Sequence, residues 1–450
     1  MKIEEFKDML FDQAKIFGFS DYELYYTASN SFSVRIFGGE ITEYKNADAV
    51  GVSFRGTYKS RIGYAFSERI DGSIIPKLLD NAAGNAQVIE EEEIERLYPG
   101  DPEYPEVDMY NPDLSSVTVE AKINMALSME KYAQKLDPRV KSIDYCGLGT
   151  TDDTVMIANS YGLDVTDRSN FAYAYVQARV EDSGVTKNGY EQWLGNDFGK
   201  FSYEAISRVA VDRAVALLGA KSVVSGEYPV IFDNLSAIDL FSAFIGIFYA
   251  ENAQKGFSLL SCKVGELIAS PAVTVRDDGV CMDSFGSVAF DSEGVATQKK
   301  IVIESGVLNT LLYNTKSAAK DGVKSTGNGF KPGFRASVGT SCTNFYLMPS
   351  KTTREEMLEG VGNGLLITGL EGLHSGTNPI SGDFSLSAEG FVVEGGKIGR
   401  AVEQITVAGN FYTLLKEIIQ TGNDLRFNIP GTGCVGMPSF LVSKLSVAGL

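Results

Sequence analysis

An arrangement of predicted elements that occurs twice in the first half of the chain does most to restrict its fold. An amphipathic helix over residues 3–17 precedes several strand-like runs, and a short helix at 74–83 closes the unit. A helix at 117–136, further strand-like runs and a helix at 202–218 repeat this order. The strand-like runs cover residues 22–27, 31–37, 40–44, 49–54 and 61–66 in the first unit, and 155–158, 163–166 and 171–180 in the second.

The turns of the two units also correspond. Gly38-Gly39 and Tyr161-Gly162 separate matching strands, and glycine suits such hairpin turns because it accepts positive φ. We interpret the pattern as a tandem duplication of a helix–antiparallel strands–helix unit. Chance similarity between two hairpin-rich sequences is the alternative.

A change of composition separates the two units. Glu90 to Glu93 form a charge run, and prolines at 99, 102, 105 and 112 punctuate the segment that follows. Such a stretch buries little and is typical of an extended linker or surface strap. The predicted division is therefore a first α+β unit at 1–89, an acidic, proline-rich linker at 90–115, a second unit at 116–224, and a β-rich C-terminal domain at 225–450.

The C-terminal domain is mostly strands, with helices expected at 236–249, 353–361 and 411–419. A chain of 450 residues exceeds what one hydrophobic core usually supports. Regular βαβ alternation is missing, which favours an α+β class with largely antiparallel sheets.

Composition argues against several classes of protein. The net charge of −18 disfavours nucleic-acid binding and docking to anionic lipid, since both depend on clustered Lys and Arg. Five scattered cysteines without a Cys-x-x-Cys pair indicate reduced thiols. The N-terminus has no signal-peptide pattern, and the most apolar stretch, 238–250, is too short to span a bilayer and contains Asp239. We expect a cytoplasmic protein.

Histidine is nearly absent, which limits the chemistry available to the chain. His374 is the only histidine and lies in a loop-like context, so neither a Ser-His-Asp triad nor a two-histidine zinc site is expected. The Gly431-x-Gly433-x-x-Gly436 pattern is followed by Pro438 and favours a turn before a final strand over a nucleotide site.

Two other features leave alternatives open. Asp277, Asp278 and Asp283 could form a carboxylate-only metal site, although Asp278-Gly279 is more simply a hairpin turn. The helix expected from Ser236 to Tyr249 is apolar on nearly every side, which predicts burial.

The order of motifs in the last third resembles that of a known family. The matching segments are 239–247, Lys255-Gly256, 264–270, 274–279, Ser381–Ser385, Gly390, 394–396, 408–410, 422–425 and 445–449. Together they resemble the third domain of the TldD/PmbA family, whose members were once called modulators of DNA gyrase. The resemblance extends over the whole chain, and no single motif carries it.

The resemblance implies a role as well as a fold. In the TldD branch of the family a helix carries His-Glu-x-x-x-His, which binds zinc and supplies a base. The equivalent positions here are Ser242, Ala243 and Ile247, as in the TldE (PmbA) branch, so the resemblance implies no metal or cofactor in this chain and zinc in a TldD-like partner subunit. The expected function is that of a non-catalytic, substrate-binding and structural subunit of a heterodimeric, cytosolic zinc metallopeptidase that degrades unfolded or extended peptides.

Peptide contacts are expected in the loop Ser381, Gly382, Asp383, Phe384 and Ser385, for which a Gly-Asp turn leading into a strand is an equal interpretation. A homodimer is possible when the partner is missing. Two alternatives remain: a stand-alone peptide-binding regulatory protein, and a peptidase that uses the Asp277–Asp278–Asp283 carboxylates.

Overall fold

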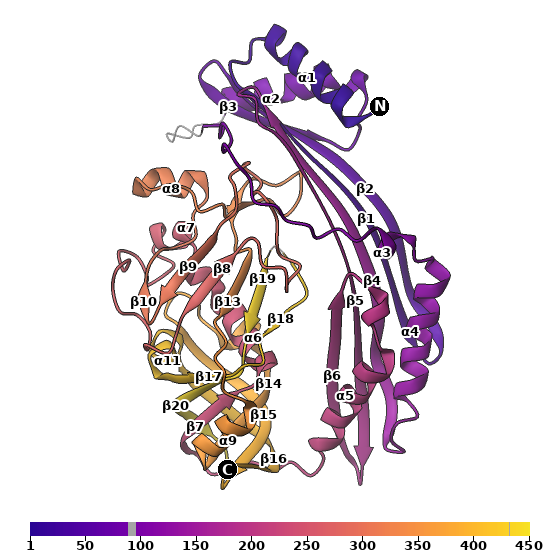
Figure 1. The fold of residues 1–450 in the computed structure, drawn as a ribbon, viewed down its shortest axis with the longest axis vertical. Coiled ribbons are helices and arrows are strands. Elements are labelled where there is room, and N and C mark those ends of the chain that lie inside the picture. The colour runs from indigo at the N-terminus through magenta and orange to yellow at the C-terminus, as the bar shows by residue number, and fades with distance from the viewer. Residues whose placement is uncertain (89–95, 432) are drawn as a thin grey trace.

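One long, curved sheet forms the N-terminal half of the molecule. The computed structural model describes residues 1–88, 96–431 and 433–450, so the predicted charge run at 90–93 lies outside the described residues. The N-terminal sheet has the strand order β3-β2-β1-β4-β5-β6 and is antiparallel throughout (Figure 1). Its strands are β1 (Tyr22–Phe37), β2 (Glu40–Tyr58), β3 (Arg61–Ser67), β4 (Val140–Asn159), β5 (Asp164–Asp182) and β6 (Val185–Gly195).

The predicted repeat is visible in this sheet, although its two units are not separate bodies. Each unit supplies three consecutive strands between two helices, and the two sets join where β1 pairs with β4, from Glu23↔Asn159 to Arg35↔Gly147. The Gly38-Gly39 turn has positive φ at both residues, as predicted. The proposed boundaries at residues 89, 115 and 224 stay a prediction.

Two predicted breaks between strands are wrong. Residues 22–27 and 31–37 belong to one strand, and so do 40–44 and 49–54. Small polar residues such as Ser29 and Asn30 suggest a turn in the sequence. In the structure Asn30 pairs with Asp48 on one side and Asp152 on the other, so both backbone edges of β1 are satisfied within the sheet.

Helices cover one face of the N-terminal sheet. They are α1 (Ile3–Phe17), α2 (Ile75–Val88), α4 (Val119–Ala133) and α5 (Tyr203–Ala216). On β1, Leu24 packs in the core beneath α1 and α2, and Phe32 and Val34 pack in the core beneath α4 and α5. These positions are all even, so they share one face of the strand. The opposite face turns toward the C-terminal half (Figure 1).

A strap, residues 96–111, links the two halves. Asn159 Nδ2 donates to the Tyr98 carbonyl at 2.7 Å, and Tyr104 Oη donates to the Gly294 carbonyl at 2.7 Å. Met109 then forms a parallel bridge to Ser169 of β5. The strap is therefore an ordered segment that contacts both the sheet and the C-terminal half.

Two mixed sheets form most of the C-terminal half. One has the order β16-β15-β14-β7-β20-β17, and the other β10-β9-β8-β13-β19-β18. Only β14–β7 and β13–β19 are parallel among the described ladders of these sheets, so the predicted α+β class with mainly antiparallel sheets is confirmed. A two-stranded ladder, β11 (Gly329–Phe330) with β12 (Gly339–Thr340), lies apart from them.

The strands of the first sheet are β7 (Gly226–Phe232), β14 (Gly364–Glu371), β15 (Asp383–Glu394), β16 (Lys397–Asn410), β17 (Ile418–Thr421) and β20 (Phe440–Ala448). Those of the second are β8 (Val275–Asp278), β9 (Lys299–Glu304), β10 (Val307–Leu308), β13 (Asn344–Leu347), β18 (Arg426–Phe427) and β19 (Cys434–Met437). Short helices connect them: α7 (Ala250–Gln254), α8 (Thr315–Asp321), α9 (Arg354–Val361), α10 (Leu373–Gly376) and α11 (Phe411–Glu417), with α3 (Pro112–Ser116) following the strap. The 3₁₀ turns are η1 (Gly72–Ile74), η2 (Phe198–Lys200) and η3 (Ile245–Phe248).

The apolar helix α6 (Asn234–Phe244) lies in the core of this half. The Phe241 ring lies 5.8 Å from Phe440 of β20, and Phe248 lies 5.0 Å from Phe345 of β13, so this segment bridges both sheets. Burial is confirmed, but the predicted length is wrong, because the α-helix ends at Phe244 and continues as η3. In η3, where the helix changes, the carbonyls of residues 246 and 247 accept hydrogen bonds from the side chains of Asn252 and Ser258.

None of the helices in the described parts of the chain has the length and apolar character needed to cross a bilayer.

Candidate functional site

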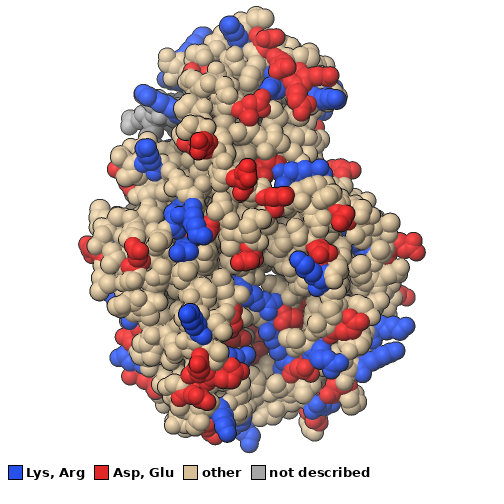
Figure 2. All heavy atoms as spheres, in the orientation of Figure 1, with Lys and Arg blue, Asp and Glu red and all other residues tan. Residues whose placement is uncertain are grey.

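A cavity of about 950 Å³ lies between the two halves of the molecule. One wall comes from β6 and α5 of the N-terminal sheet, and the other from α6, β14, β15 and β16. Figure 2 shows the molecule hollowed between these halves, with charged side chains of both signs around the opening. Its walls therefore join segments that are far apart in the sequence.

Acidic side chains outnumber basic ones in the cavity. Six carboxylates line it, Asp212, Asp233, Asp239, Glu371, Glu389 and Glu403, against three cations, Lys187, Arg213 and Arg354. Lys187 pairs with Glu403, and Arg213 pairs with Glu191 at 3.2 Å. Asp239, Glu371 and Glu389 have no ion-pair or hydrogen-bond partner among the described residues. The cavity thus contains uncompensated negative charge.

The protein surroundings alter the ionisation of two of these groups. Burial raises the pKa of Asp239 to about 6, and the nearby Asp233 carboxylate adds to the increase. Burial also raises the pKa of Glu389, with Glu371 contributing. Asp239 is nevertheless exposed to water, because the cavity is open to solvent. Protein atoms surround the side chain on its other sides. Neighbouring carboxylates and the protein walls both disfavour the charged form of these groups.

The free edge of β6 runs along the cavity. Residues 186–190 line it consecutively, and β6 pairs only with β5 among the described strands. The carbonyls of Tyr190 and Gln192 accept from Arg213 at 2.7 Å and Arg426 at 2.9 Å. The backbone of residues 186–189 has no partner on that side within the described chain. An extended peptide could therefore add a strand there.

A glycine allows the helix behind β6 to approach closely. A Cβ at Gly189 would come within 2.1 Å of the Ala210 carbonyl oxygen of α5. Helix α5 consequently packs directly on β6 and leaves the edge of the strand facing the cavity.

Helix α6 and the turn η3 that follows it carry the positions equivalent to the zinc motif, Ser242 and Ala243 on α6 and Ile247 on η3. Ser242 follows Ile238 and Asp239 by about one turn, so it lies on the same side of α6 as these two lining residues. Its buried Oγ has no hydrogen-bond partner in the described residues. Ala243 packs at the edge of the core, and Ile247 is fully buried within it.

These residues do not fit a zinc ion. Zinc sites use imidazole, thiolate or carboxylate ligands, whereas the three positions offer one neutral hydroxyl and two hydrocarbon side chains. The described residues contain no cluster of three His, Cys, Asp or Glu side chains able to hold a metal ion.

The predicted peptide loop lies at the start of β15. Asp383 accepts from Ser381 Oγ at 2.8 Å and from Asn410 Nδ2 at 2.9 Å, and these bonds lower the pKa of its carboxyl. Phe384 is buried and lies 6.3 Å from Phe244 of α6. Gly382 has φ of 84°, which glycine adopts without strain. The segment forms a turn leading into a strand, and its role in binding peptide stays a prediction.

The lone histidine and the glycine-rich stretch lie in a short turn and at the start of a strand. His374 is exposed on the short turn α10. Strand β19 starts at Cys434 and contains Gly436, so the last glycine of the stretch lies in a strand and not in the predicted turn before the final strand, β20.

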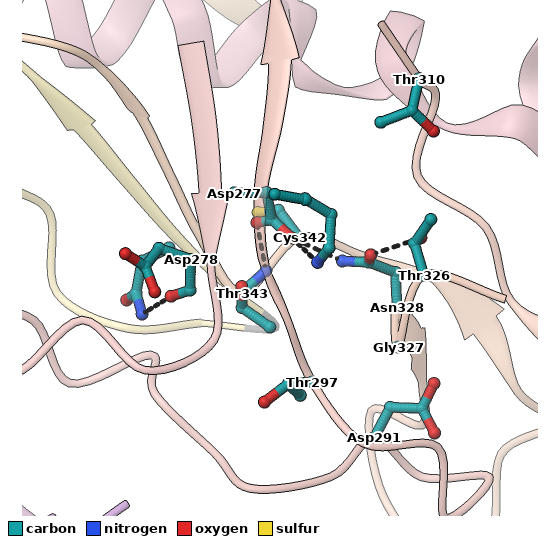
Figure 3. A network of polar contacts seen from close by, with 12 residues as sticks. Asp277, Asp278, Asp291, Thr297, Thr310, Thr326, Gly327, Asn328, Cys342 and Thr343 are labelled. Carbon is teal, nitrogen blue, oxygen red and sulfur yellow. Dashed lines mark hydrogen bonds and ion pairs between the residues drawn. The ribbon is translucent and has the colours of Figure 1, made fainter. Parts of the chain in front are cut away.

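The carboxylates proposed as a metal site have other partners. Asp277 accepts from Lys300 Nζ and Asn328 Nδ2, each at 2.8 Å, and from the Thr343 N–H at 2.7 Å (Figure 3). Asp278 lies 3.3 Å from Lys299 Nζ, and Asp283 is exposed. The loop from 279 to 298 separates β8 from β9, so the tight hairpin turn at Asp278-Gly279 is wrong. Asp277 belongs to a satisfied structural network.

Sequence reasoning missed the residues that give the cavity its charge. Asp239 could have been noticed in the sequence, because it is the one charged side chain in an apolar helix. Nothing in the sequence distinguishes Glu371 and Glu389, since each is one of many acidic residues on strands.

The fold defines a class: α+β proteins in which two consecutive three-stranded units form one antiparallel six-stranded sheet, followed by a β-rich C-terminal half. Residues 22–86, 112–218 and 225–449 match the models for domain 1, the central domain and the C-terminal domain of the PmbA/TldA metallopeptidases. The chain belongs to the PmbA/TldD family.

Several known proteins are similar to this chain over most of its length. A Thermotoga maritima protein described as a candidate modulator of a DNA gyrase is 34% identical, with a TM-score of 0.92, over 99% of this chain and 100% of that one. TldE from Thermococcus kodakarensis has a TM-score of 0.91 at 23% identity over 99% and 100% of the two chains, and shows the shared fold. The metalloprotease PmbA of Escherichia coli O157:H7 is 26% identical over 77% of this chain and 73% of its own length.

Proposed function

We propose that this chain is a TldE-like, non-catalytic subunit that binds peptide substrate for a zinc metallopeptidase. One observation carries the proposal: a cavity runs along a free strand edge, and α6 on its wall, with the following η3, has Ser242, Ala243 and Ile247 where the catalytic branch has zinc ligands and a base. The chain can hold a peptide there, but these positions cannot activate water for its cleavage.

The substrate class follows from the cavity. Backbone N–H and C=O groups of β6 residues 186–189 would pair with an extended peptide of any sequence. Asp239, Glu371 and Glu389 would then favour Lys and Arg side chains. We therefore propose unfolded or extended peptides with a basic character as ligands.

A TldD-like partner supplies the zinc and the cleavage step in this proposal, and both proteins act in the cytosol. The test is a degradation assay on an unfolded peptide with this chain alone, with a His-Glu-x-x-x-His relative alone, and with both. We expect no cleavage by this chain and cleavage by the pair. Cleavage by this chain after removal of every contaminating protease would contradict the proposal. If the chain binds peptide and no metal-binding relative associates with it, the stand-alone regulatory role replaces this one.

Binding is tested separately by fluorescence anisotropy. Labelled extended peptides of equal length, one rich in Lys and one rich in Glu, are titrated with the wild type, Asp239→Asn and the control Glu355→Gln, which removes an exposed carboxylate on α9. We expect the basic peptide to bind more tightly, and Asp239→Asn to weaken it about tenfold, as for loss of a charged hydrogen bond of about 1.5 kcal/mol. Equal affinity for both peptides would refute the basic preference.

A further inference from the structure

A second cavity, of about 510 Å³ and called here the helix-side pocket, lies against the N-terminal sheet. Its floor is the middle of β1, β2 and β4 with the start of β5, and its wall is α3 and the first turn of α4. Figure 1 shows α1 and α2 at one end of the sheet and α3 and α4 further along it. The helix-side pocket shares no lining residue with the peptide cavity beside β6.

Lys122 of α4 places a buried charge in this pocket. The residue lines the pocket, yet it is only 8% exposed. Its Nζ donates to Thr150 Oγ1 at 2.9 Å and lies 5.2 Å from the centre of the Phe32 ring. No carboxylate pairs with Lys122 among the described residues, and burial lowers the pKa of its ammonium group. A buried lysine usually has an anionic partner, so this one lacks a group that it would be expected to have.

Asp48 of β2 supplies a charge of the opposite sign. Its exposed carboxylate accepts from Asn30 Nδ2 at 2.6 Å and has no cationic partner in the described parts of the chain. The other carboxylate of the pocket, Asp152, already pairs with Arg168 at 3.1 Å. The helix-side pocket therefore contains one uncompensated charge of each sign, a buried ammonium and an exposed carboxylate.

The spacing of these two charges suits one small molecule. Asn46 lies directly opposite Phe32 in the β1–β2 ladder, so Asp48 is a diagonal neighbour of Phe32, and such neighbours are about 7–8 Å apart. Lys122 lies over the Phe32 ring. An α-amino acid that makes one hydrogen bond through its carboxylate and another through its ammonium spans about 9 Å. The side chains of Lys122 and Asp48 can adjust to the small difference.

We propose that the helix-side pocket binds a free α-amino acid, with its carboxylate on Lys122 and Thr150 and its α-ammonium on Asp48. The Thr150 hydroxyl accepts from Lys122 and still has a hydrogen to donate to the ligand. A simple anion would leave Asp48 uncompensated, and a simple amine would leave Lys122 without a partner. A zwitterion satisfies both, and opposite charges at its two ends fix its orientation.

The ligand's own side chain would meet a partly apolar surface. Three hydrocarbon side chains line the pocket, those of Ala28, Val50 and Leu114. Val50 is 40% exposed, so part of this surface is open to a ligand. We therefore expect a neutral, apolar amino acid such as leucine to bind more tightly than aspartate or lysine.

The test compares three ligands by isothermal titration calorimetry on the full-length protein. They are L-leucine, N-acetyl-L-leucine, which has no ammonium, and L-leucinamide, which has no carboxylate. We expect leucine to bind at least about tenfold more tightly than either analogue, as for loss of one charged hydrogen bond. This comparison uses only the wild type, so it does not depend on whether a variant folds.

Two variants then assign each end of the ligand. Lys122→Met keeps the buried hydrocarbon stem, and it should weaken leucine binding about tenfold and remove the difference between leucine and leucinamide. Asp48→Asn should remove the difference between leucine and N-acetyl-leucine. Lys131→Met on α4 and Asp113→Asn on α3 change exposed residues outside the pocket and should bind leucine as the wild type does.

Four results overturn the proposal. They are no leucine binding at about 10 mM, N-acetyl-leucine or leucinamide binding as tightly as leucine, aspartate or lysine binding more tightly than leucine, and leucine binding that neither pocket variant weakens. Asp239→Asn in the peptide cavity should leave leucine binding unchanged, so failure here and failure of the proposed function are distinguishable. Leucine binding that only Asp239→Asn weakens would place the ligand in the peptide cavity and exclude the helix-side pocket.

Discussion

Asp239 shows how a single residue gives an apolar helix a polar function. It stands on α6 among buried phenylalanines and leucines, yet its carboxylate faces the cavity. The protein walls and Asp233 raise its pKa to about 6. Since an aspartate in an unfolded chain has a pKa of about 4, the folded protein binds a proton more readily than the unfolded chain between pH values of about 4 and 6. Ionisation of Asp239 therefore disfavours the folded state, and its charge is tolerated for a reason other than stability.

We predict that binding of a basic peptide depends on pH through this group. Asp239 attracts a cation only when ionised, so affinity should increase as pH rises through about 6 and be lost as pH falls below it. In Asp239→Asn this step should disappear, leaving a flatter profile. Anisotropy titrations between pH 5 and 8 at constant ionic strength measure it. An unchanged pH profile in the variant would assign the titration to another group.

At this scale the sequence restricts which metal ligands the chain can offer, but it does not show which carboxylates come together. With one histidine, a two-histidine zinc site cannot be built from these residues, whatever the fold. The cavity carboxylates could not be predicted, because Asp239, Glu371 and Glu389 come from α6, β14 and β15 and meet only after the sheets assemble. Likewise, Asp277 looked like part of a metal site because its partner Lys300 lies 23 positions away.

Among the elements, the strap has the clearest structural role. Its proline-rich composition predicted an extended path, and the structure agrees. Its docking was not predictable, since it depends on single residues of β4 and β5. Asn170, 1% exposed, accepts from the Asn111 N–H and donates from Nδ2 to the Asn111 carbonyl at 2.7 Å, so its amide replaces a strand partner.

We predict that Asn170→Ala releases the strap from β5. The change removes two hydrogen bonds to the backbone of residue 111 and leaves buried groups unsatisfied, a loss of about 2–3 kcal/mol. Hydrogen exchange should become faster at residues 109–111 and 169–171. The control Asn46→Ala lies on the exposed stretch of β2 and should leave exchange at the strap unchanged. Uniformly faster exchange throughout the protein would instead indicate a general loss of stability.

The ends of helices and strands could be predicted from the sequence where capping residues and turns determine them. The opening helix ends before Gly18, whose φ of 105° suits glycine, and Thr353 caps α9 through a capping box. Boundaries failed where tertiary pairing dominates, as in the long strands β1 and β2. There, neighbours on both sides hold polar residues in extended structure against their local preference for turns.

At the scale of the whole molecule, a loop of the C-terminal half docks on the N-terminal sheet. The Tyr64 hydroxyl bonds to the Phe334 carbonyl, and the Phe334 ring lies 6.1 Å from Phe66 of β3. A Cβ at Gly51 would meet that ring at 2.3 Å, so any larger residue there would displace the Phe334 ring. Tyr25 and Phe290 extend the apolar junction.

We predict that Phe334→Ala weakens the coupling between the two halves. A partly buried phenylalanine of this kind contributes about 2 kcal/mol, much of it across the junction. Scanning calorimetry should then resolve a second unfolding transition or a broader one. The control Phe257→Ala, at a residue that is 50% exposed, should change the thermogram little. A single transition shifted without broadening would mean that the halves unfold together regardless of this contact.

The seam between β1 and β4 also affects the order in which the protein can form during synthesis. Strands β1 to β3 and both of their helices are complete at Val88, but β4 ends at Asn159. At roughly 5–20 residues per second, a ribosome needs about 4–14 s to supply the missing strand. Throughout that interval the inner edge of β1 has no partner, so the emerging chain is open to premature association with other strands until its second unit arrives.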